Sequence, residues 1–343
     1  MDNTIRFQYA QRGDLYQIST FLDHCWRNTY QTIVSDNYLA TMSMETRYAG
    51  LCKRYDEKTS RFLMMSDGDL LIGVTVFGKS FTKGYGDDGE ISAIYLHQDY
   101  IGKGIGHRLF EKTEQALTVM GYTHFVLDVF TANTRARQFY LNHGYEIVDE
   151  RMFPLGETEY PMTILRKENP LTIRQETPAD HTAVYDLTKT AFAEMEHADG
   201  DEQDMVERLR KRDGFLPALS LVAELDGEIV GHIIFTELKI GDHAGVVLGP
   251  VSVLPAHMRQ GIGGALIQRG HAVAKSLGFP LSVLVGHADY YPRFGYEPIA
   301  PHGITFPVDA PAECMMVKFL DESGKSVQGM AKFPAEHFPA EGG

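Results

Sequence analysis

The chain has 343 residues, 43% of them hydrophobic and 23% charged, a composition typical of a folded globular protein with room for two domains of ordinary size. Its formal net charge of −14 argues against nucleic acid as the main partner and mildly favours cationic small molecules, although acidity also serves solubility. No apolar stretch approaches the roughly 20 residues that span a bilayer, and residues 1–11 lack the apolar block of a secretory signal, so we expect a cytoplasmic protein without membrane contact.

The first half of the chain predicts alternating strands and helices that lead to a glycine-rich loop. A strand at 5–9 precedes a helix opened by Asp14, and a second helical stretch follows at 44–55. Alternation and β-branched residues predict a hairpin. The later elements are the hairpin strands 61–65 and 70–77, a strand at 90–96, the glycine loop 102–106 opening a helix, a strand at 125–130, and the aromatic pair Phe139-Tyr140 followed by Gly144-Tyr145.

The second half repeats this order of parts. It contains a strand at 171–175, a helix start at 178–180, a helix near 205–210, a hairpin at 219–225 and 228–235, a strand at 246–253, the loop 261–264 opening a helix, a strand at 281–285, and Tyr290-Tyr291 followed by Gly295-Tyr296. A duplicated order of motifs constrains the fold more than any single motif. Residues 166–170, polar and closed by a proline, are the expected linker, and a last strand is expected near 330–333. We therefore predict two α/β domains, 1–167 and 168–343.

The two glycine loops are candidate phosphate-binding sites. A glycine loop that opens a helix presents unpaired backbone N–H groups to one point, and the helix dipole adds partial positive charge there. One copy alone is read equally well as a structural turn, so the duplication favours binding. A Walker loop is excluded because neither copy has Gly-Lys followed by Ser or Thr. A dinucleotide fingerprint fits poorly because each loop follows antiparallel hairpins in mid-domain.

These residues resemble the GNAT superfamily of acyl-CoA N-acyltransferases, twice and over nearly the whole chain. In the first half the resemblance rests on EISAIYL at 90–96, GKGIG at 102–106 and the pattern N-x-x-A-x-x-F-Y-x-x-x-G-Y at 133–145. In the second half, which is similar to an uncharacterised bacterial subgroup, it rests on LGPVSVLP at 248–255, QGIG at 260–263 and YYPRFGY at 290–296. It implies a central mixed, mostly antiparallel sheet in each half, with a splayed, bulged central strand and flanking helices.

The resemblance implies acetyl-CoA as the cofactor, with pyrophosphate on the loop amides and pantetheine paired to the preceding strand. The implied residues are Ile94, Leu96, Gly102, Lys103, Gly104, Ile105, Gly106 and Asn133 in the first half, and Val251, Val253, Arg259, Gln260, Gly261, Ile262, Gly263 and Gly264 in the second. Asn133 has the alternative role of a plain helix N-cap. Where the family usually has Gln or Arg, three residues before the first essential glycine, this chain has Ile101 and Met258. That departure removes a side-chain contact and leaves the backbone donors in place.

Acetyl transfer to an amine needs a neutral amine, a polarised carbonyl and a proton for the departing thiolate. By resemblance, Tyr140 and Tyr291 protonate the sulfur, and the backbone N–H of Ile94 or of Val251 polarises the thioester. Glu90 stands at the offset of the family's general-base glutamate, with a solvated strand residue as the alternative. Its counterpart, Val247, cannot accept a proton, so the second half needs water, His287 or an acidic helix residue as its base.

The resemblance leaves the acceptor open within the class of primary amines on small molecules or peptides. The acceptor usually enters between the first two helices, where the second half has an acidic run: Glu194, Glu196, Asp199, Asp201, Glu202 and Asp204. This run is either a solvated loop or a funnel for a cationic amine. No metal site is expected. The cysteines, at 25, 52 and 314, lie outside the predicted sites, so direct transfer is expected without an acyl-cysteine intermediate.

Three functional hypotheses follow from these residues. In the first, at least one half acetylates an amine, and the first half is the better candidate. In the second, one half is a non-catalytic acyl-CoA-binding or scaffolding module, most plausibly the second, because of Val247. In the third, the chain is a nucleotide-binding regulator. The protein is expected to be a monomer or a homodimer.

Overall fold

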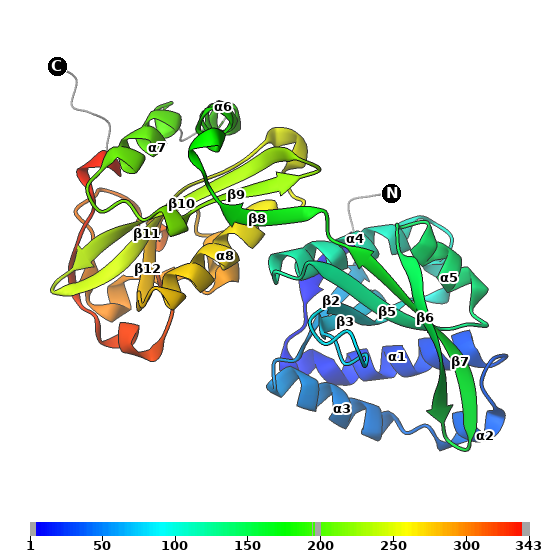
Figure 1. Cartoon of the computed structure of the whole chain (residues 1–343). Helices are drawn as coiled ribbons and strands as arrows, with labels where there is room; N and C mark the ends of the chain where they lie inside the picture. Colours follow the sequence, from blue (N-terminus) through cyan, green and yellow to red (C-terminus); the bar gives the residue numbers. More distant parts are fainter. Residues whose placement is uncertain (1–4, 194, 196–199, 338–343) are drawn as a thin grey trace. The chain divides into compact units, whose positions relative to one another are not determined.

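The computed structural model describes residues 5–193, 195 and 200–337, and the chain divides along its length into two compact units between Asn169 and Pro170 (Figure 1). Of the predicted acidic run, Glu194, Glu196 and Asp199 lie outside the described residues. Each unit contains one mixed sheet flanked by helices, so the predicted fold class is confirmed.

The sheet of the first unit has seven strands. They are β1 (Ile5–Tyr9), β2 (Ser60–Asp67), β3 (Leu70–Lys79), β4 (Gly89–Leu96), β5 (His124–Phe130), β6 (Glu146–Leu155) and β7 (Thr158–Glu168). Their order is β1-β2-β3-β4-β5-β7-β6, and only β4 and β5 are parallel. A single parallel pair in the middle of the sheet separates it into two antiparallel parts.

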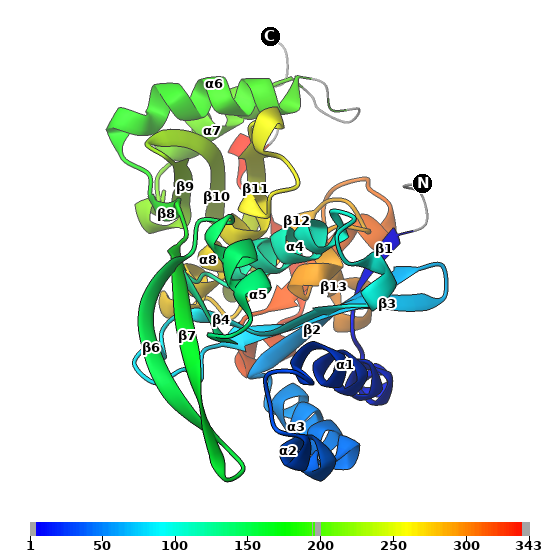
Figure 2. The same ribbon diagram turned by 90° about the vertical axis from the view of Figure 1, so that its right-hand side faces the viewer.

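Helices cover both faces of this sheet (Figure 2). The helices are α1 (Leu15–Tyr30), α2 (Asp36–Thr41), α3 (Met44–Asp56), α4 (Ile105–Val119) and α5 (Thr134–Leu141). Leu15, Ile18 and Leu22 recur at helical spacing on α1, and they are buried against Phe62 and Val74 of the sheet. On the opposite face, α4 and α5 contribute an aromatic cluster around Phe110.

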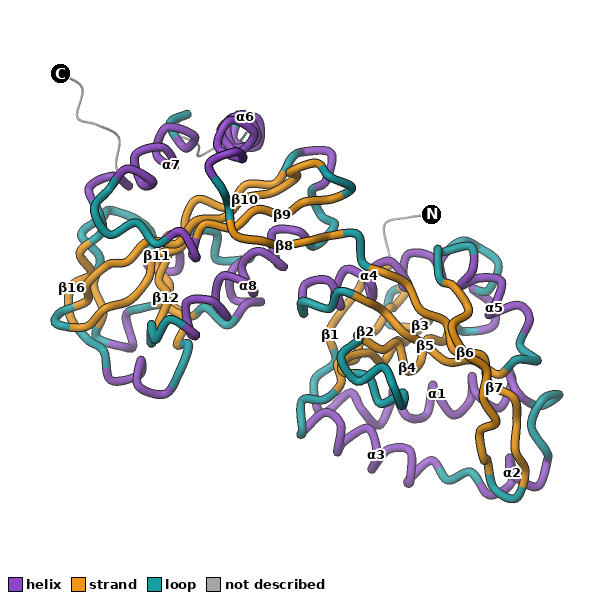
Figure 3. The backbone as a smooth tube through the Cα atoms, in the orientation of Figure 1, coloured by secondary structure: helices purple, strands orange, loops and turns teal. Residues whose placement is uncertain are grey.

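The second unit also combines a sheet with helices (Figure 3), and its strand order repeats that of the first. Its strands are β8 (Leu171–Gln175), β9 (Ser220–Leu225), β10 (Glu228–Ile240), β11 (His243–Val253), β12 (Leu281–Val285), β13 (Glu297–Pro298), β14 (Ile304–Thr305), β15 (Met315–Phe319) and β16 (Gly329–Lys332). The path β8-β9-β10-β11-β12-β15-β13 matches the seven strands of the first unit, and β11 and β12 are its parallel pair. The helices are α6 (His181–Phe192), α7 (Glu202–Lys211) and α8 (Ile262–Ser276).

One expectation about the connecting segments needs correction. Residues 166–168, predicted as part of a linker, are the last residues of β7, where Arg166 pairs with Val126 of β5 and with Glu146 of β6. Tyr291 does not lie on an α-helix as Tyr140 does, because it begins a 3₁₀ turn, Tyr291–Phe294, with Pro292 in its first turn. The tail strand expected near 330–333 is confirmed as β16, which pairs with β10.

Candidate active site

The central strands of the first unit separate where the predicted thioester site lies. Strands β4 and β5 share only two paired positions, Gly89 with Phe125 and Glu90 with Val126. Strand β4 stays paired with β3 as far as Leu96, with a bulge at Ser92. Ile94 and Leu96 therefore lie where β4 has no pairing with β5, so the backbone along that edge is open to an extended ligand.

The second unit has the same arrangement of its parallel strands. Strands β11 and β12 pair only at Val246 with Ser282 and Val247 with Val283. The register between β10 and β11 shifts before Val251, which places a bulge at the corresponding point. Val251 and Val253 thus lie beside an open strand edge in the same way as Ile94 and Leu96.

The two glycine loops share one backbone conformation. Gly102 and Gly104 have φ angles of 83° and 76°, and the corresponding residues, Arg259 and Gly261, have φ angles of 64° and 91°. Arginine rarely adopts a positive φ, so the shape of the loop is imposed at this position and is not a consequence of glycine content. Helix α4 begins at Ile105 and α8 at Ile262, so the first amides of each helix point toward the loop without intrahelical acceptors.

The other loop residues named by the sequence surround these amides. The Lys103 ammonium lies 5.4 Å from the ring centre of Tyr100, and the Gln260 amide donates to the Ala256 carbonyl at 3.2 Å. A Cβ atom on Gly106 would stand 3.0 Å from the Leu96 side chain, so glycine allows close packing of α4 on β4. Gly263 and Gly264 occupy the first turn of α8. Both loops can hold an anion through backbone donors and the helix dipole.

Tyr140 is buried on α5 within an aromatic cluster. Its ring centre lies 5.7 Å from that of Phe110 and 6.3 Å from that of Tyr145. Burial raises the pKa of Tyr140 well above its ordinary value, and the charges of Tyr30 and Asp128 raise it further, so the phenol is protonated at neutral pH. Asn133 caps α5, because its Oδ1 accepts from the Ala136 N–H at 3.1 Å, which is the alternative role considered for it.

Glu90 is buried, and one of its carboxylate oxygens is surrounded by donors. Its Oε2 accepts from the Ser80 hydroxyl at 2.9 Å, the Phe81 N–H at 2.8 Å, and the Thr82 N–H and hydroxyl at 3.0 Å each. Four donors on one oxygen leave that oxygen little room for a further hydrogen bond. The prediction that Glu90 is the general base stays a prediction, and this geometry weighs against it.

Asp128 is a residue of this site that the sequence analysis missed. It lies on β5 two residues beyond Val126, which pairs with Glu90. Because residues two apart in a strand point to the same face, Asp128 lies on the same face of the sheet as Val126. The Asp128 side chain is exposed, but the protein packed around it removes part of its hydration. This desolvation, together with the negative charge of Glu90, raises the pKa of Asp128 to about 6. A lone carboxylate in the apolar strand HFVLDVF was the available signal.

The second unit lacks both carboxylates. Its register places Val247 at the position of Glu90, as predicted, and Val285 at the position of Asp128. Tyr291 retains a phenol whose pKa burial raises well above its ordinary value. His287, a suggested base, is exposed beyond the end of β12. The second site therefore combines a binding loop and a phenol with an apolar strand pair.

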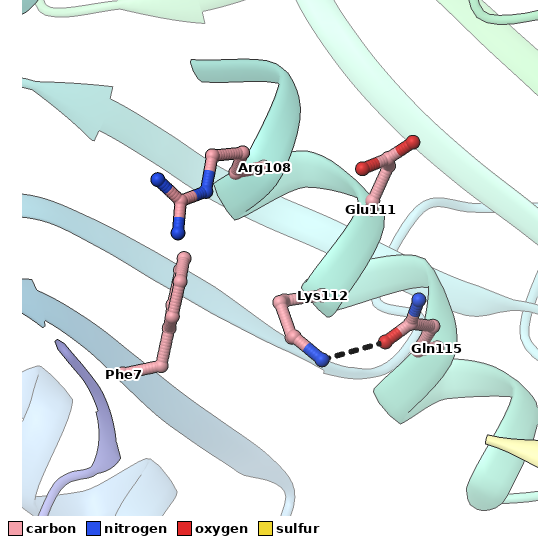
Figure 4. A pocket seen from close by; sticks show the side chains of 5 residues that line it. All are labelled: Phe7, Arg108, Glu111, Lys112 and Gln115. Atoms are coloured by element: carbon pink, nitrogen blue, oxygen red, sulfur yellow. Dashed lines mark hydrogen bonds between the residues drawn. The ribbon is translucent and has the colours of Figure 1, made fainter. Parts of the chain in front are cut away.

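A separate hollow of about 230 Å³ lies between β1 and α4 (Figure 4). It is lined by Phe7, Arg108, Glu111, Lys112 and Gln115, and the Lys112 ammonium donates to Gln115 at 3.1 Å. It shares no residue with either predicted site, and we assign no chemistry to it. Among residues 5–193, 195 and 200–337, no three His, Cys, Asp or Glu residues are placed to hold a metal ion. Within the same residues, no helix is both long and apolar enough to cross a bilayer.

An anion-binding glycine loop beside an open strand edge, present once in each of two α/β units, defines the class of protein. Family models match both units: "Acetyltransferase (GNAT) family" over residues 17–145 and "Acetyltransferase (GNAT) domain" over residues 172–299. The chain is 35% identical over 136 residues to an uncharacterized N-acetyltransferase, YjhQ, of Escherichia coli K12, covering 37% of this chain and 75% of that protein. The chain belongs to the GNAT acetyltransferase family.

Solved structures include similar proteins. One is a GNAT family acetyltransferase from Brucella melitensis in complex with acetyl-CoA, at 32% identity and a TM-score of 0.42, covering 49% of this chain and 98% of that one. Another is the N-acetyltransferase YhbS from Escherichia coli in complex with CoA, at 26% identity and a TM-score of 0.45, covering 49% and 92%.

Proposed function

We propose that the first unit transfers an acetyl group directly from acetyl-CoA to the primary amine of a small molecule or peptide, and that it works in the cytoplasm as a monomer or a homodimer. The observation that carries this proposal is the open edge of β4, which leads toward the loop at Gly104, with the protonated phenol of Tyr140 close enough to raise the pKa of Tyr95 on the same strand. The relatives crystallised with acetyl-CoA or CoA support this choice of cofactor.

The proposed reaction uses backbone and side-chain groups of the first unit. Loop amides bind the pyrophosphate, and the backbones of Ile94 and Leu96 pair with pantetheine. The neutral amine attacks the thioester carbon while the N–H of Ile94 donates to the carbonyl oxygen as charge develops there. The C–S bond then breaks, and the Tyr140 hydroxyl donates its proton to the departing sulfur.

We further propose that the second unit binds acyl-CoA without turning it over. Its loop and its open edge at Val251 and Val253 match those of the first unit, so the binding groups are present. Val247 and Val285 replace the two carboxylates, so no proton acceptor faces the thioester from the central strands. An acyl-CoA-binding or scaffolding role requires only the first set of groups.

The matched pair Tyr140→Phe and Tyr291→Phe tests both proposals on the full chain. Wild-type protein should bind two equivalents of CoA by calorimetry and release free thiol from acetyl-CoA with a suitable amine from a library. Tyr140→Phe should lower kcat about 10²- to 10⁴-fold because the proton donor is lost, and Tyr291→Phe should leave turnover unchanged. Absence of thiol release from wild type with every amine would refute the first proposal, and a large loss in Tyr291→Phe would refute the second.

A further inference from the structure

We propose that Asp128, and not Glu90, is the base that removes the proton from the acceptor's ammonium group. This inference rests on the proposed function of the first unit. Both carboxylates lie at the parallel strand pair, but they differ in what surrounds them.

Asp128 stands where the two central strands have separated. Because β4 and β5 are parallel and pair at Glu90 with Val126, the residues two places further on, Ser92 and Asp128, lie at the same level on opposite sides of the opening. Ser92 is at the bulge of β4, two residues before Ile94. The Asp128 carboxylate is thus one step nearer than Glu90 to the N–H expected to polarise the thioester.

The hydrogen-bond partners of the two carboxylates also favour Asp128 as the base. Glu90 has an oxygen already occupied by four donors from residues 80–82. Within the described part of the chain, the Asp128 carboxylate makes no hydrogen bond or ion pair with another residue's side chain, and the residue is exposed. An incoming ammonium group would therefore find a carboxylate without side-chain donors on Asp128, whereas on the buried Glu90 one of the two oxygens is already occupied.

The charged and titratable groups around Asp128 come from several elements. Glu90 faces it from β4, Tyr30 from α1 and Tyr140 from α5, and each senses its charge. On α3, the Arg54 guanidinium binds the Ser92 hydroxyl at 2.7 Å and lies near Glu90. On β7, which pairs with β5, Arg166 stands two residues from Ile164, the partner of Asp128, and its guanidinium is held by Asp88. The charge of Glu90 raises the pKa of Asp128, which strengthens Asp128 as a base.

The proton balance of the step is closed. Asp128 takes one proton from R–NH₃⁺ and later releases it to solvent. The nitrogen lone pair of R–NH₂ forms the C–N bond, and the C–S electron pair leaves on sulfur. Tyr140 gives its proton to that sulfur and regains one from the nitrogen, so the products are the amide, the free thiol and one proton. No further reactant is needed.

The test compares Asp128→Asn, Glu90→Gln and the control Asp69→Asn in the full chain, following thiol release from acetyl-CoA across pH 5–10. Asp69 is exposed in the turn between β2 and β3, so its variant should behave as wild type. Wild-type kcat/KM should fall as pH drops through about 6, where Asp128 gains its proton. Asp128→Asn should lose about 10²- to 10⁴-fold at pH 7, and this defect should shrink toward the amine's own pKa of about 10, where the free amine needs no base.

In Glu90→Gln, kcat/KM should still fall at acidic pH, but the fall should occur at lower pH than in wild type, because removal of the neighbouring charge lowers the pKa of Asp128. The inference is overturned if Asp128→Asn keeps wild-type turnover, or if Glu90→Gln instead abolishes this fall at acidic pH. Inactive wild type refutes the proposed function itself, and the inference with it. Folding is checked separately: since the carboxylate is partly desolvated, Asp128→Asn should bind CoA as wild type does and should not unfold at a lower temperature at pH 7.5.

Discussion

Replacement of Glu176 by glutamine should destabilise the second unit through a buried polar cluster. The Arg210 guanidinium donates to both oxygens of Glu176, and the Ser220 hydroxyl donates to Oε2 at 2.6 Å. The hydroxyl of Ser220 also lies 3.0 Å from Nε2 of His232. Burial alone would raise the pKa of Glu176, but His232, and after it Arg210 and Ser220, outweigh burial and lower the pKa to about 2. Burial lowers the pKa of His232 in turn, and Arg210 holds the carboxylate through both of its oxygens.

The size of the effect follows from the pKa. A shift from 4.5 to about 2 corresponds to about 3 kcal/mol, at about 1.4 kcal/mol for each pH unit. Loss of one partner from a buried ion pair costs about 3–5 kcal/mol, which agrees. Because the pKa is lowered on folding, this stabilisation is complete above pH 4.5 and is lost as pH falls from 4.5 toward 2. The difference in free energy of unfolding between wild type and Glu176→Gln should therefore become smaller as the pH falls from 4.5 toward 2.

Hydrogen exchange measures this locally. At pH 7 the amides of β8, β9 and β10 in Glu176→Gln should lose about 3 kcal/mol of protection, while urea unfolding at pH 7 and at pH 3.5 follows the pH dependence. Glu228→Gln, at the exposed start of β10, is the matched control. The Arg210–Glu176 pair does not stabilise this unit if Glu176→Gln and Glu228→Gln have the same free energy of unfolding at pH 7. The same conclusion follows if the difference in free energy of unfolding between wild type and Glu176→Gln stays constant down to pH 3.5.

Two glycine substitutions, each with a matched control, test packing and loop conformation. Gly270→Ala would place a Cβ in steric conflict with the Phe235 ring, so it should lower the free energy of unfolding in a thermal or urea melt by about 1–3 kcal/mol. Gly50→Ala, exposed in α3 with nothing within 4 Å of the added Cβ, should raise it by up to about 1 kcal/mol. Gly104→Ala forces a positive φ on an L-residue at a cost of about 1–2 kcal/mol. Calorimetry should therefore show CoA binding about 5- to 30-fold weaker, or the free energy of unfolding should fall by about the same 1–2 kcal/mol. Gly13→Ala is the control.

The sequence predicts the parts of this fold that depend on local signals. The loop at Gly104, the strand at 90–96 and the Asp226-Gly227 turn all carry turn or alternation patterns that a short window contains. The strands β6 and β7 were not recognised as a hairpin. Most of β6 is exposed, with Met152 and Phe153 facing solvent, so no regular alternation of apolar and polar residues marks it.

The candidate site was predictable only in part, because its chemistry depends on register. A motif offset was enough to select Glu90, but its four donors come from residues 80–82, whose positions only the folded chain defines. Asp128 belongs to the site because β4 and β5 pair in parallel at a particular position, and no pattern within β5 encodes that pairing. Prediction of the proton acceptors therefore requires the strand register of the folded chain, whereas the backbone donors of the loop can be predicted from the positions of its glycines.

This difference also explains how the two units can share a binding geometry and differ in chemistry. The binding proposed for the loop at Gly261 and the open edge at Val251 uses main-chain groups, so substitution of nearby side chains, including arginine where the first unit has Gly102, leaves the donors in place. Proton transfer needs a carboxylate at one position, and a single change to valine at 247 or 285 removes it. Loss of turnover in one unit thus needs fewer substitutions than loss of binding. We expect the second unit to retain cofactor affinity even where it has no catalytic activity.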